Sequence, residues 1–181
     1  MATKASNKKT GKKTAKKAAK KIGKKTKKKT TADDSVVASQ IIPLGVTRLV
    51  LPNVAIAEIV PASAFETVNK APKWLLGKLK WRGVTVPLVS YELTCGMKAG
   101  EITAQSRFII LNTLNGNSKI SFFAIISSAI PQLVKLDANI VKMADNSNDQ
   151  TTILATLEID GEPALIPDID AIEEMLSKHL K

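Results

Sequence analysis

The alternation of apolar and polar residues from Trp74 to Glu92 is the clearest pattern in the chain. Apolar or small residues at positions 77, 79 and 81 alternate with Lys78, Lys80 and Arg82, and a period of two resumes after Gly83. This period is typical of β-strands with one buried face. Arg82 and Gly83 fall where the chain must reverse, and glycine readily adopts the positive φ of tight turns. The pattern predicts a β-hairpin with a guanidinium at its tip.

Pro87 interrupts the second strand of this hairpin. Proline has no backbone N–H and cannot donate to a neighbouring strand, so it is normally confined to edge strands and bulges. We therefore expect the second strand to be an edge strand or bulged at Pro87, with part of its backbone free to pair with another segment.

Three further hairpins and one helical turn are predicted from the same kind of pattern. Short apolar runs flank turn-forming residues in each case, and Pro52-Asn53 interrupts the strand before the run from Val54 to Ile59 continues it. Tight turns joining short strands, with few helices, predict an all-β body of small barrel-like sheets. The hairpins pair residues 36–44 with 48–51, 107–114 with 120–126 across Asn115-Gly116, and 152–159 with 162–166 across Asp160-Gly161; the helical turn covers 91–95 and ends at Gly96.

The C-terminal segment predicts a short amphipathic helix. Its apolar residues lie at helical spacing, at positions 172, 175, 176 and 180. Asp170 and Glu173 have the spacing of a capping box, and Asp168 is an alternative cap. Lys178 and His179 lie at the end where basic groups complement the helix dipole. We expect the apolar stripe to pack against a sheet.

Charge divides the chain into two parts. Residues 1–31 contain 14 Lys and no acidic residue, whereas the other 150 residues contain 13 basic and 16 acidic side chains. A segment so charged and so poor in apolar residues is expected to be disordered, which predicts a Lys-rich tail over residues 1–35 and a folded domain over 36–181. The tail carries lysine pairs at Lys8, Lys9, Lys12, Lys13, Lys16, Lys17, Lys20, Lys21, Lys24 and Lys25.

The composition of this tail resembles that of the Lys/Ala-rich tails of linker histones and histone-like bacterial proteins. The lysine pairs could bind DNA or another polyanion without sequence specificity, through release of counterions. A solubilising or tethering tail without a dedicated ligand is the alternative, and the residues do not decide between them.

The residues that enzymes and cofactor sites need are missing from the sequence. Its single His179 lies near the C-terminal end, and its single Cys95 has no neighbouring base, so we interpret it as a small core residue. No Cys/His cluster, phosphate-binding glycine loop or calcium loop is present; the polar segment 145–156 lacks the glycine and glutamate of an EF-hand. These features predict a protein that is not an enzyme and has no cofactor or metal.

The sequence also gives no sign of a membrane-spanning helix or a signal peptide. The longest apolar runs, such as 122–126, are far shorter than the roughly 20 residues of a membrane-spanning helix. The basic N-terminus is not followed by the apolar region of a signal peptide. We expect a cytoplasmic protein.

The segment Trp-Leu-Leu-Gly-Lys-Leu-Lys-Trp-Arg-Gly-Val-Thr-Val-Pro-Leu-Val, residues 74–89, resembles the central signature of CheW-like domains. In that signature a glycine and an Arg-Gly pair lead into a strand containing Val-Pro. The upstream run 49–59, with Ile56, Glu58 and Ile59, resembles the family's second strand. Among the members, the divergent pilus-type (ChpC-like) proteins are the most similar. The chain departs from the usual pattern at Trp81, Ser90, Ser127 and Ser128.

The resemblance implies a mainly β fold of two small five-stranded barrels, with a short C-terminal helix and the basic tail in front. It also implies an adaptor that joins a chemoreceptor signalling domain to the regulatory domain of a histidine kinase, in chemotaxis or in type IV pilus (twitching) motility. Matched by position, the residues expected to contact partners are Arg82, Gly83, Val86, Ile56 and Glu58. The alternative hypothesis is a histone-like architectural protein that binds DNA through its tail.

Overall fold

The computed structural model describes residues 36–113, 120–137, 142–143 and 150–180. The chain divides into two compact units, Met1–Asp34 and Ser35–Lys181, and the described residues belong to the second. In the part of the chain that the structure describes, no helix is both long and apolar enough to cross a bilayer.

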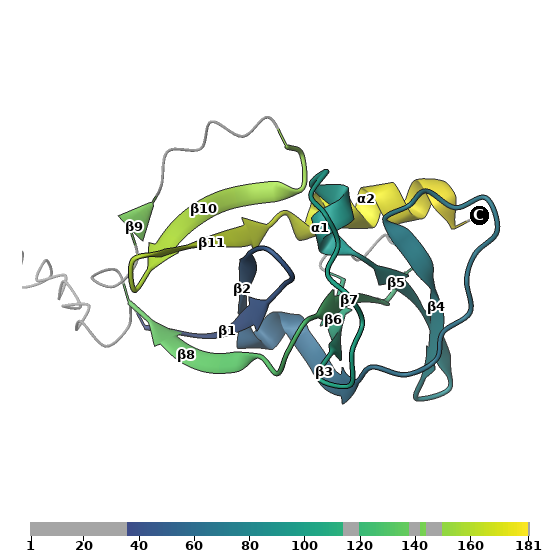
Figure 1. Cartoon of the computed structure of the whole chain (residues 1–181), viewed down its shortest axis with the longest axis horizontal. Coiled ribbons are helices and arrows are strands. Elements are labelled where there is room, and N and C mark those ends of the chain that lie inside the picture. Colours follow the sequence, from purple (N-terminus) through teal and green to yellow (C-terminus); the bar gives the residue numbers. More distant parts are fainter. Residues whose placement is uncertain (1–35, 114–119, 138–141, 144–149, 181) are drawn as a thin grey trace, which may run out of the picture. The chain divides into compact units, whose positions relative to one another are not determined.

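The second unit is built mainly of short strands, with two α-helices and a short 3-10 turn (Figure 1). In chain order these elements are β1 (Val37–Pro43), β2 (Arg48–Pro52), η2 (Asn53–Ala55), β3 (Ile56–Pro61), β4 (Leu75–Trp81), β5 (Val84–Val89), α1 (Tyr91–Thr94), β6 (Arg107–Asn112), β7 (Phe122–Ser127), β8 (Gln132–Leu136), β9 (Lys142–Met143), β10 (Ile153–Ile159), β11 (Glu162–Pro167) and α2 (Ile169–His179).

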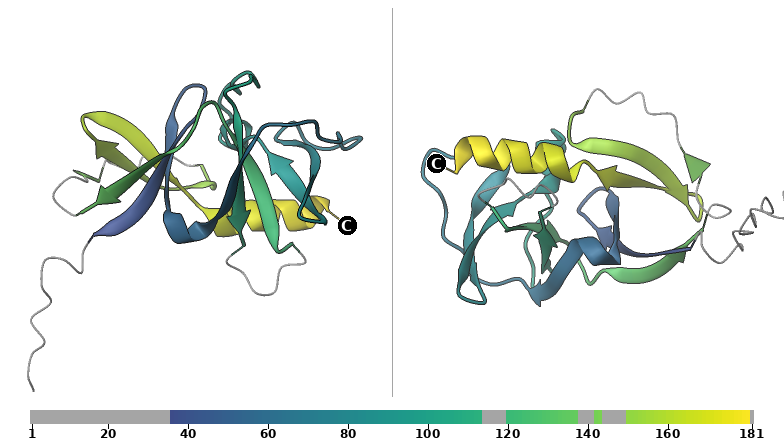
Figure 2. Two further views of the ribbon diagram at one scale, coloured as in Figure 1. Left: turned by 90° about the horizontal axis from the view of Figure 1, so that it is seen from below. Right: turned by 180° about the vertical axis from the view of Figure 1, so that it is seen from behind.

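The strands form two sheets that lie beside each other (Figure 2). One has five strands in the order β3-β6-β7-β5-β4, and the other has six in the order β8-β1-β2-β11-β10-β9. The sixth strand, β9, is only two residues long. The prediction of a mainly β protein with two small sheets and a short C-terminal helix is therefore confirmed, with one very short strand more than expected.

All four predicted hairpins pair as the sequence indicates. β1 pairs with β2, β4 with β5, β6 with β7, and β10 with β11, each antiparallel. Asp160 and Gly161 have φ of 54° and 77°, as a two-residue hairpin turn requires. The turn predicted at Asn115-Gly116 lies outside the described residues, as do residues 145–149 of the polar segment 145–156. The strands β8 and β9 were not predicted.

The run from Arg48 to Ile59 is not one interrupted strand. Pro52-Asn53 does end β2, as expected, but η2 then carries the chain into the other sheet, where β3 pairs with β6. The five-stranded sheet is thus formed by residues 56–127, inserted between the segments that form the six-stranded sheet.

The C-terminal helix α2 packs its apolar stripe into the largest core cluster. Ile169, Ile172 and Leu176 are buried there together with residues from both sheets, such as Leu49 and Ile109. Asp168 is the N-cap, because its carboxylate accepts the Ala171 N–H at 2.9 Å. Of the two caps that the sequence left open, the structure therefore selects Asp168.

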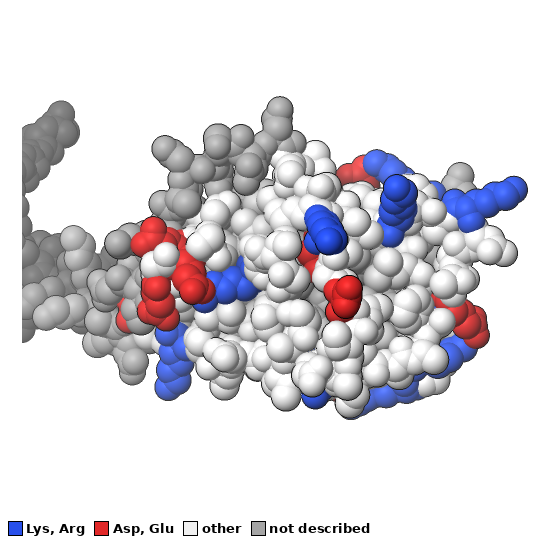
Figure 3. Space-filling model, in the orientation of Figure 1, with Lys and Arg blue, Asp and Glu red and all other residues white. Residues whose placement is uncertain are grey.

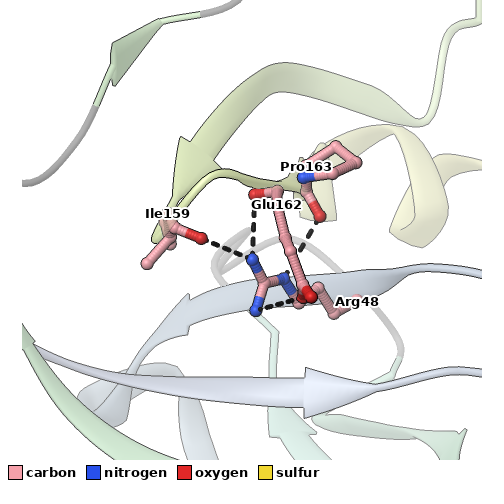
Figure 4. A network of polar contacts seen from close by, with 4 residues as sticks. All are labelled: Arg48, Ile159, Glu162 and Pro163. Atoms are coloured by element: carbon pink, nitrogen blue, oxygen red, sulfur yellow. Dashed lines mark hydrogen bonds and ion pairs between the residues drawn. The ribbon is translucent and has the colours of Figure 1, made fainter.

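Arg48 fastens the β10–β11 hairpin to β2. Its guanidinium donates to the carbonyl oxygens of Ile159 at 2.6 Å, Glu162 at 2.8 Å and Pro163 at 3.2 Å, and pairs with the Glu162 carboxylate at 3.1 Å (Figure 4). β2 and β11 themselves pair in parallel only at Leu49 and Leu165. Because the backbone ladder is so short, the guanidinium supplies much of the polar connection between the two halves of this sheet.

We predict that Arg48→Ala lowers the free energy of unfolding by about 2–3 kcal/mol, because three carbonyls lose a charged donor. Glu162→Gln is the matched control: it removes only an ion pair whose carboxylate side chain is 72% exposed, and should cost about 0.5 kcal/mol or less. Urea denaturation measures both. Equal losses for the two variants would mean that the ion pair, and not the carbonyl contacts, holds the hairpin.

Candidate partner-binding site at the β4–β5 hairpin

The β4–β5 hairpin turns at Arg82 and Gly83, as the sequence predicts. Their φ angles are 48° and 81°, and Trp81 pairs with Val84 directly across the turn. Positive φ at both central residues defines the tight turn whose twist matches that of antiparallel strands. Arg82 therefore adopts a conformation that non-glycine residues disfavour, and its exposed side chain is presented at the tip of the hairpin.

Glu58 connects this tip to the opposite edge of the five-stranded sheet. β3 and β4 are the two outer strands in the sheet order, yet the Glu58 Oε2 atom accepts the Trp81 Nε1–H at 2.6 Å and lies 3.0 Å from Arg82 Nε. The sheet must therefore curl until its edges meet. Glu58 closes the sheet in the manner of a barrel, which agrees with the barrel-like subdomain that the resemblance implied.

The Arg82 side chain is oriented but accessible. Its guanidinium carbon lies 5.2 Å from the centroid of the Trp81 ring, and 69% of the side chain is exposed. Trp81 is itself packed edge-on against Phe122, with ring centroids 4.9 Å apart. The Nε group of Arg82 lies against Glu58, and the exposure of the side chain leaves the guanidinium accessible to a carboxylate or carbonyl of a partner.

A β-bulge in β3 decides which faces of the sheet Ile56 and Glu58 occupy. Ile56 pairs with Leu111 but Glu58 pairs with Ile110, so an extra residue, Ala57, shifts the alternation of β3. Ile56 consequently packs against the main core cluster, whereas Glu58 lies on the side of Trp81. Their spacing in the sequence suggested that Ile56 and Glu58 face one common surface, but in the structure they face different sides of the sheet.

Val86 is a correction to the predicted set. Its side chain is 1% exposed and belongs to the core cluster of the five-stranded sheet, beside Leu79 and Leu88. It cannot contact a partner without unfolding of the hairpin. The alternation of β5 did place Val86 on the apolar face, and that face is interior.

The prediction of an edge strand at Pro87 is also wrong. β5 lies between β7 and β4, and its parallel pairing with β7 begins at Leu88, one residue after the proline. Pro87 is thus accommodated where the ladder with β7 has not yet begun. The bulge near this site lies in β4, between Leu75 and Gly77.

The outer edge of β4 is covered by the segment that follows β3. Glu66 and Lys78 exchange two backbone hydrogen bonds, at 2.8 Å and 2.7 Å. A side chain on Gly77 would come within 2.2 Å of the Glu66 carbonyl oxygen and 2.7 Å of the Phe65 ring. The glycine in the Gly-x-x-x-x-Arg-Gly segment is therefore required by a close crossing of two chains, and the covering segment helps to hold β4 in place.

Trp81 is the functional candidate that the sequence reasoning missed. From the sequence it was interpreted as an apolar residue of the hairpin and as a departure from the family pattern, and its indole N–H was not considered as a donor. A half-buried Trp normally finds a partner for this group, which is the signal that could have led to Glu58.

Cys95 and His179 each make a contact within the fold. Among the described residues there is no cluster of His, Cys, Asp and Glu that could hold a metal ion. Cys95 is 3% exposed and contacts the Thr152 hydroxyl. The Nδ1 atom of His179 lies 2.8 Å from the Met175 carbonyl oxygen at the end of α2. The tail lysines Lys8 to Lys25 lie outside the described residues.

Comparison with known proteins identifies the family. The family model described as the CheW-like domain matches residues 40–176. Among solved structures, the scaffolding protein TtCheW from Thermoanaerobacter tengcongensis is similar in fold: the TM-score is 0.63 at 16% sequence identity, over 74% of this chain and 84% of that one. None of the curated proteins matches the chain significantly. Because the family model spans well over half of the chain, this protein belongs to the CheW-like domain family.

Proposed function

We propose that the protein is a cytoplasmic, non-catalytic adaptor that couples a chemoreceptor signalling domain to the regulatory domain of a histidine kinase. Membership of the CheW-like family supports a scaffolding role in chemotaxis. The observation that carries the proposal for the site is Arg82, which Glu58 and Trp81 orient while 69% of its side chain stays exposed. The finer proposal, that the pathway controls type IV pilus motility, rests on the resemblance of residues 74–89 to the pilus-type members.

The partner-binding surface that we propose contains fewer residues than the sequence predicted. Arg82 and Gly83 are exposed at the hairpin tip, and Glu58 is partly exposed beside them. Val86 is buried in the core cluster against which Trp81 packs, so it supports this surface from below, whereas the half-buried Ile56 packs against the other core cluster. Arginine anchors held by aromatic neighbours are frequent among the residues that dominate protein–protein binding energy.

We predict that Arg82→Glu weakens binding of the receptor signalling domain or the kinase regulatory domain at least roughly 30-fold, as expected for an arginine hot spot worth about 2 kcal/mol. The exposed ion pair with Glu58 contributes little to folding, so the thermal midpoint should change by no more than about 2–4 °C. Calorimetric titration of the full chain against each domain measures the affinity.

Glu58→Gln separates docking from internal pairing, because its amide oxygen can still accept the Trp81 N–H while the charge that pairs with Arg82 is removed. If Arg82 acts only through Glu58, this variant should weaken binding as much as Arg82→Glu does. If Arg82 contacts the partner, binding by Glu58→Gln should stay close to that of the unaltered chain. Equal losses in the two variants would therefore reject the proposed contact, and absence of binding to both domains by the unaltered chain would reject the adaptor function.

The charge of residues 1–31 favours a second candidate function, binding of DNA through the tail in the manner of a histone-like protein. Fourteen lysines without an acidic neighbour are an electrostatic footprint for polyanions. The two functions are compatible, because the tail precedes the segment that the CheW-like family model matches. A tail bound to DNA or another polyanion would raise the local concentration of the adaptor.

We predict salt-dependent DNA binding by the full chain and none by a chain beginning at Asp33. If about six lysines contact phosphates, the logarithmic salt slope is about −5, and the affinity falls roughly a thousandfold between 50 and 200 mM salt. Gel-shift titrations with two unrelated duplexes measure the affinity and test sequence independence. Equal DNA binding by both chains would assign the activity to the folded domain instead.

A further inference from the structure

Three loops from different parts of the chain meet beside α1, near the beginning of β4. The β1–β2 turn and the loop after α1 touch at two glycines, because a Cβ on Gly45 would lie 2.7 Å from the Cα of Gly100. The segment after β7 joins them through Ser128, whose N–H donates to Pro43 O at 2.9 Å and whose hydroxyl donates to Leu44 O at 3.2 Å. Arg82, by contrast, follows the far end of β4.

A buried carboxylate lies where the loops meet. Glu92 is 5% exposed, and its Oε1 accepts the N–H groups of Gly45 at 3.4 Å and Gly100 at 3.3 Å, while Oε2 accepts the Ser90 hydroxyl at 3.0 Å. Two of these contacts are long for hydrogen bonds to an ionised acceptor. All three donors are neutral, so none of these contacts neutralises the carboxylate.

Glu92 lines a cavity of about 100 Å3 that has apolar walls. The walls are formed by Leu76, Ile126, Ile102 and Ala99, and Ser90, Gly100, Glu101 and Ser128 complete the lining. Small-molecule sites usually measure about 300–1,000 Å3, so this cavity has room for one side chain but not for a typical metabolite. It contains no basic lining residue among those that the structure describes.

The lining fits one kind of side chain. An aliphatic stem is complementary to the apolar walls, and a cationic end group would compensate the charge of Glu92, which is costly to bury without a counter-charge. Lysine and arginine combine these two properties. Glu101, an exposed carboxylate in the same lining, would also attract the cationic end group.

The surroundings of the cavity point to a protein segment as the source of that side chain. Each of the three loops carries one large exposed apolar residue: Val46 is 63% exposed, Ile102 47% and Ile130 63%. Ile102 lines the cavity itself, while Val46 and Ile130 lie within two residues of Gly45 and Ser128, which join the same loops. Exposed apolar residues on the loops beside a pocket are typical of protein-binding sites. We infer that this cavity receives a lysine or arginine side chain from an extended segment of a partner protein, with apolar residues beside it contacting the three loops.

The test uses the peptide acetyl-Ala-Leu-Lys-Leu-Ala-amide and its analogue with norleucine in place of lysine, which keeps the stem and removes the charge. Titrations of the full chain are followed by amide NMR, because the Gly45 and Gly100 N–H groups donate to Glu92 and report directly on it. We expect saturable shifts of both amides with the lysine peptide, at a Kd of about 1 mM or tighter, and at least tenfold weaker binding of the norleucine peptide. No saturable shift, or equal binding of the two peptides, would overturn the inference.

Glu92→Gln keeps the size of the side chain and should weaken binding of the lysine peptide at least tenfold. If that variant does not fold, Glu101→Gln at the exposed part of the lining should weaken binding several-fold. Glu66→Gln, an exposed carboxylate outside the lining, is the matched control and should leave the Kd unchanged. An unchanged Kd in both lining variants would also overturn the inference. The result is independent of the adaptor function, because neither peptide nor variant involves Arg82.

Discussion

Closure of the five-stranded sheet depends on one carboxylate, which joins the two outermost strands. Glu58, on β3, receives the indole N–H of Trp81 and the guanidinium of Arg82 at the end of β4, although the two strands are outermost in the sheet order. A hydrogen bond to a charged acceptor contributes about 1.5–3 kcal/mol when it is partly shielded from water. With only 34% of the Glu58 side chain exposed, the indole contact is in that setting, whereas the exposed Arg82 contributes less to stability.

Because Trp81 contributes to stability and Arg82 contributes little, the hairpin tip can be fixed and still be accessible to a partner. Trp81 packs against Phe122 and closes the sheet, so the turn does not need Arg82 to remain in place. The Arg82 Nε group lies 3.0 Å from Glu58 and the guanidinium lies over the Trp81 ring, which limits the conformations of a long side chain before any partner binds. Binding by a side chain held in this way loses less conformational entropy than binding by a free arginine.

Local patterns in the sequence predicted the elements formed by neighbouring residues. The turn at Arg82-Gly83 follows from the glycine and from alternation on both sides, and the cap of α2 follows from the acidic residues before it. The sheet order did not follow, because the parallel pairs β5–β7 and β2–β11 join segments far apart in the chain. The bulges at Ala57 and Leu76 have no glycine or proline at the inserted residue, so nothing in the sequence revealed that Ile56 and Glu58 face different sides.

Polar contacts to backbone groups recur wherever loops or hairpins from different parts of the chain meet. Arg48 binds three carbonyls of the β10–β11 hairpin, Ser127 and Ser128 bind carbonyls at the end of the β1–β2 hairpin, and the Tyr91 hydroxyl binds Thr152 O at 2.9 Å. Burial of that hydroxyl raises the pKa of Tyr91, so it remains a neutral donor.

Contacts of this kind specify one arrangement of the loops, because a shifted loop leaves a buried group without its partner. On the face in Figure 3, acidic side chains gather near the turn of β10 and β11, while basic ones are spread over the five-stranded sheet. Loops that are fixed by such contacts hold the charged side chains above them at set positions, which is what binding through complementary shape and charge requires.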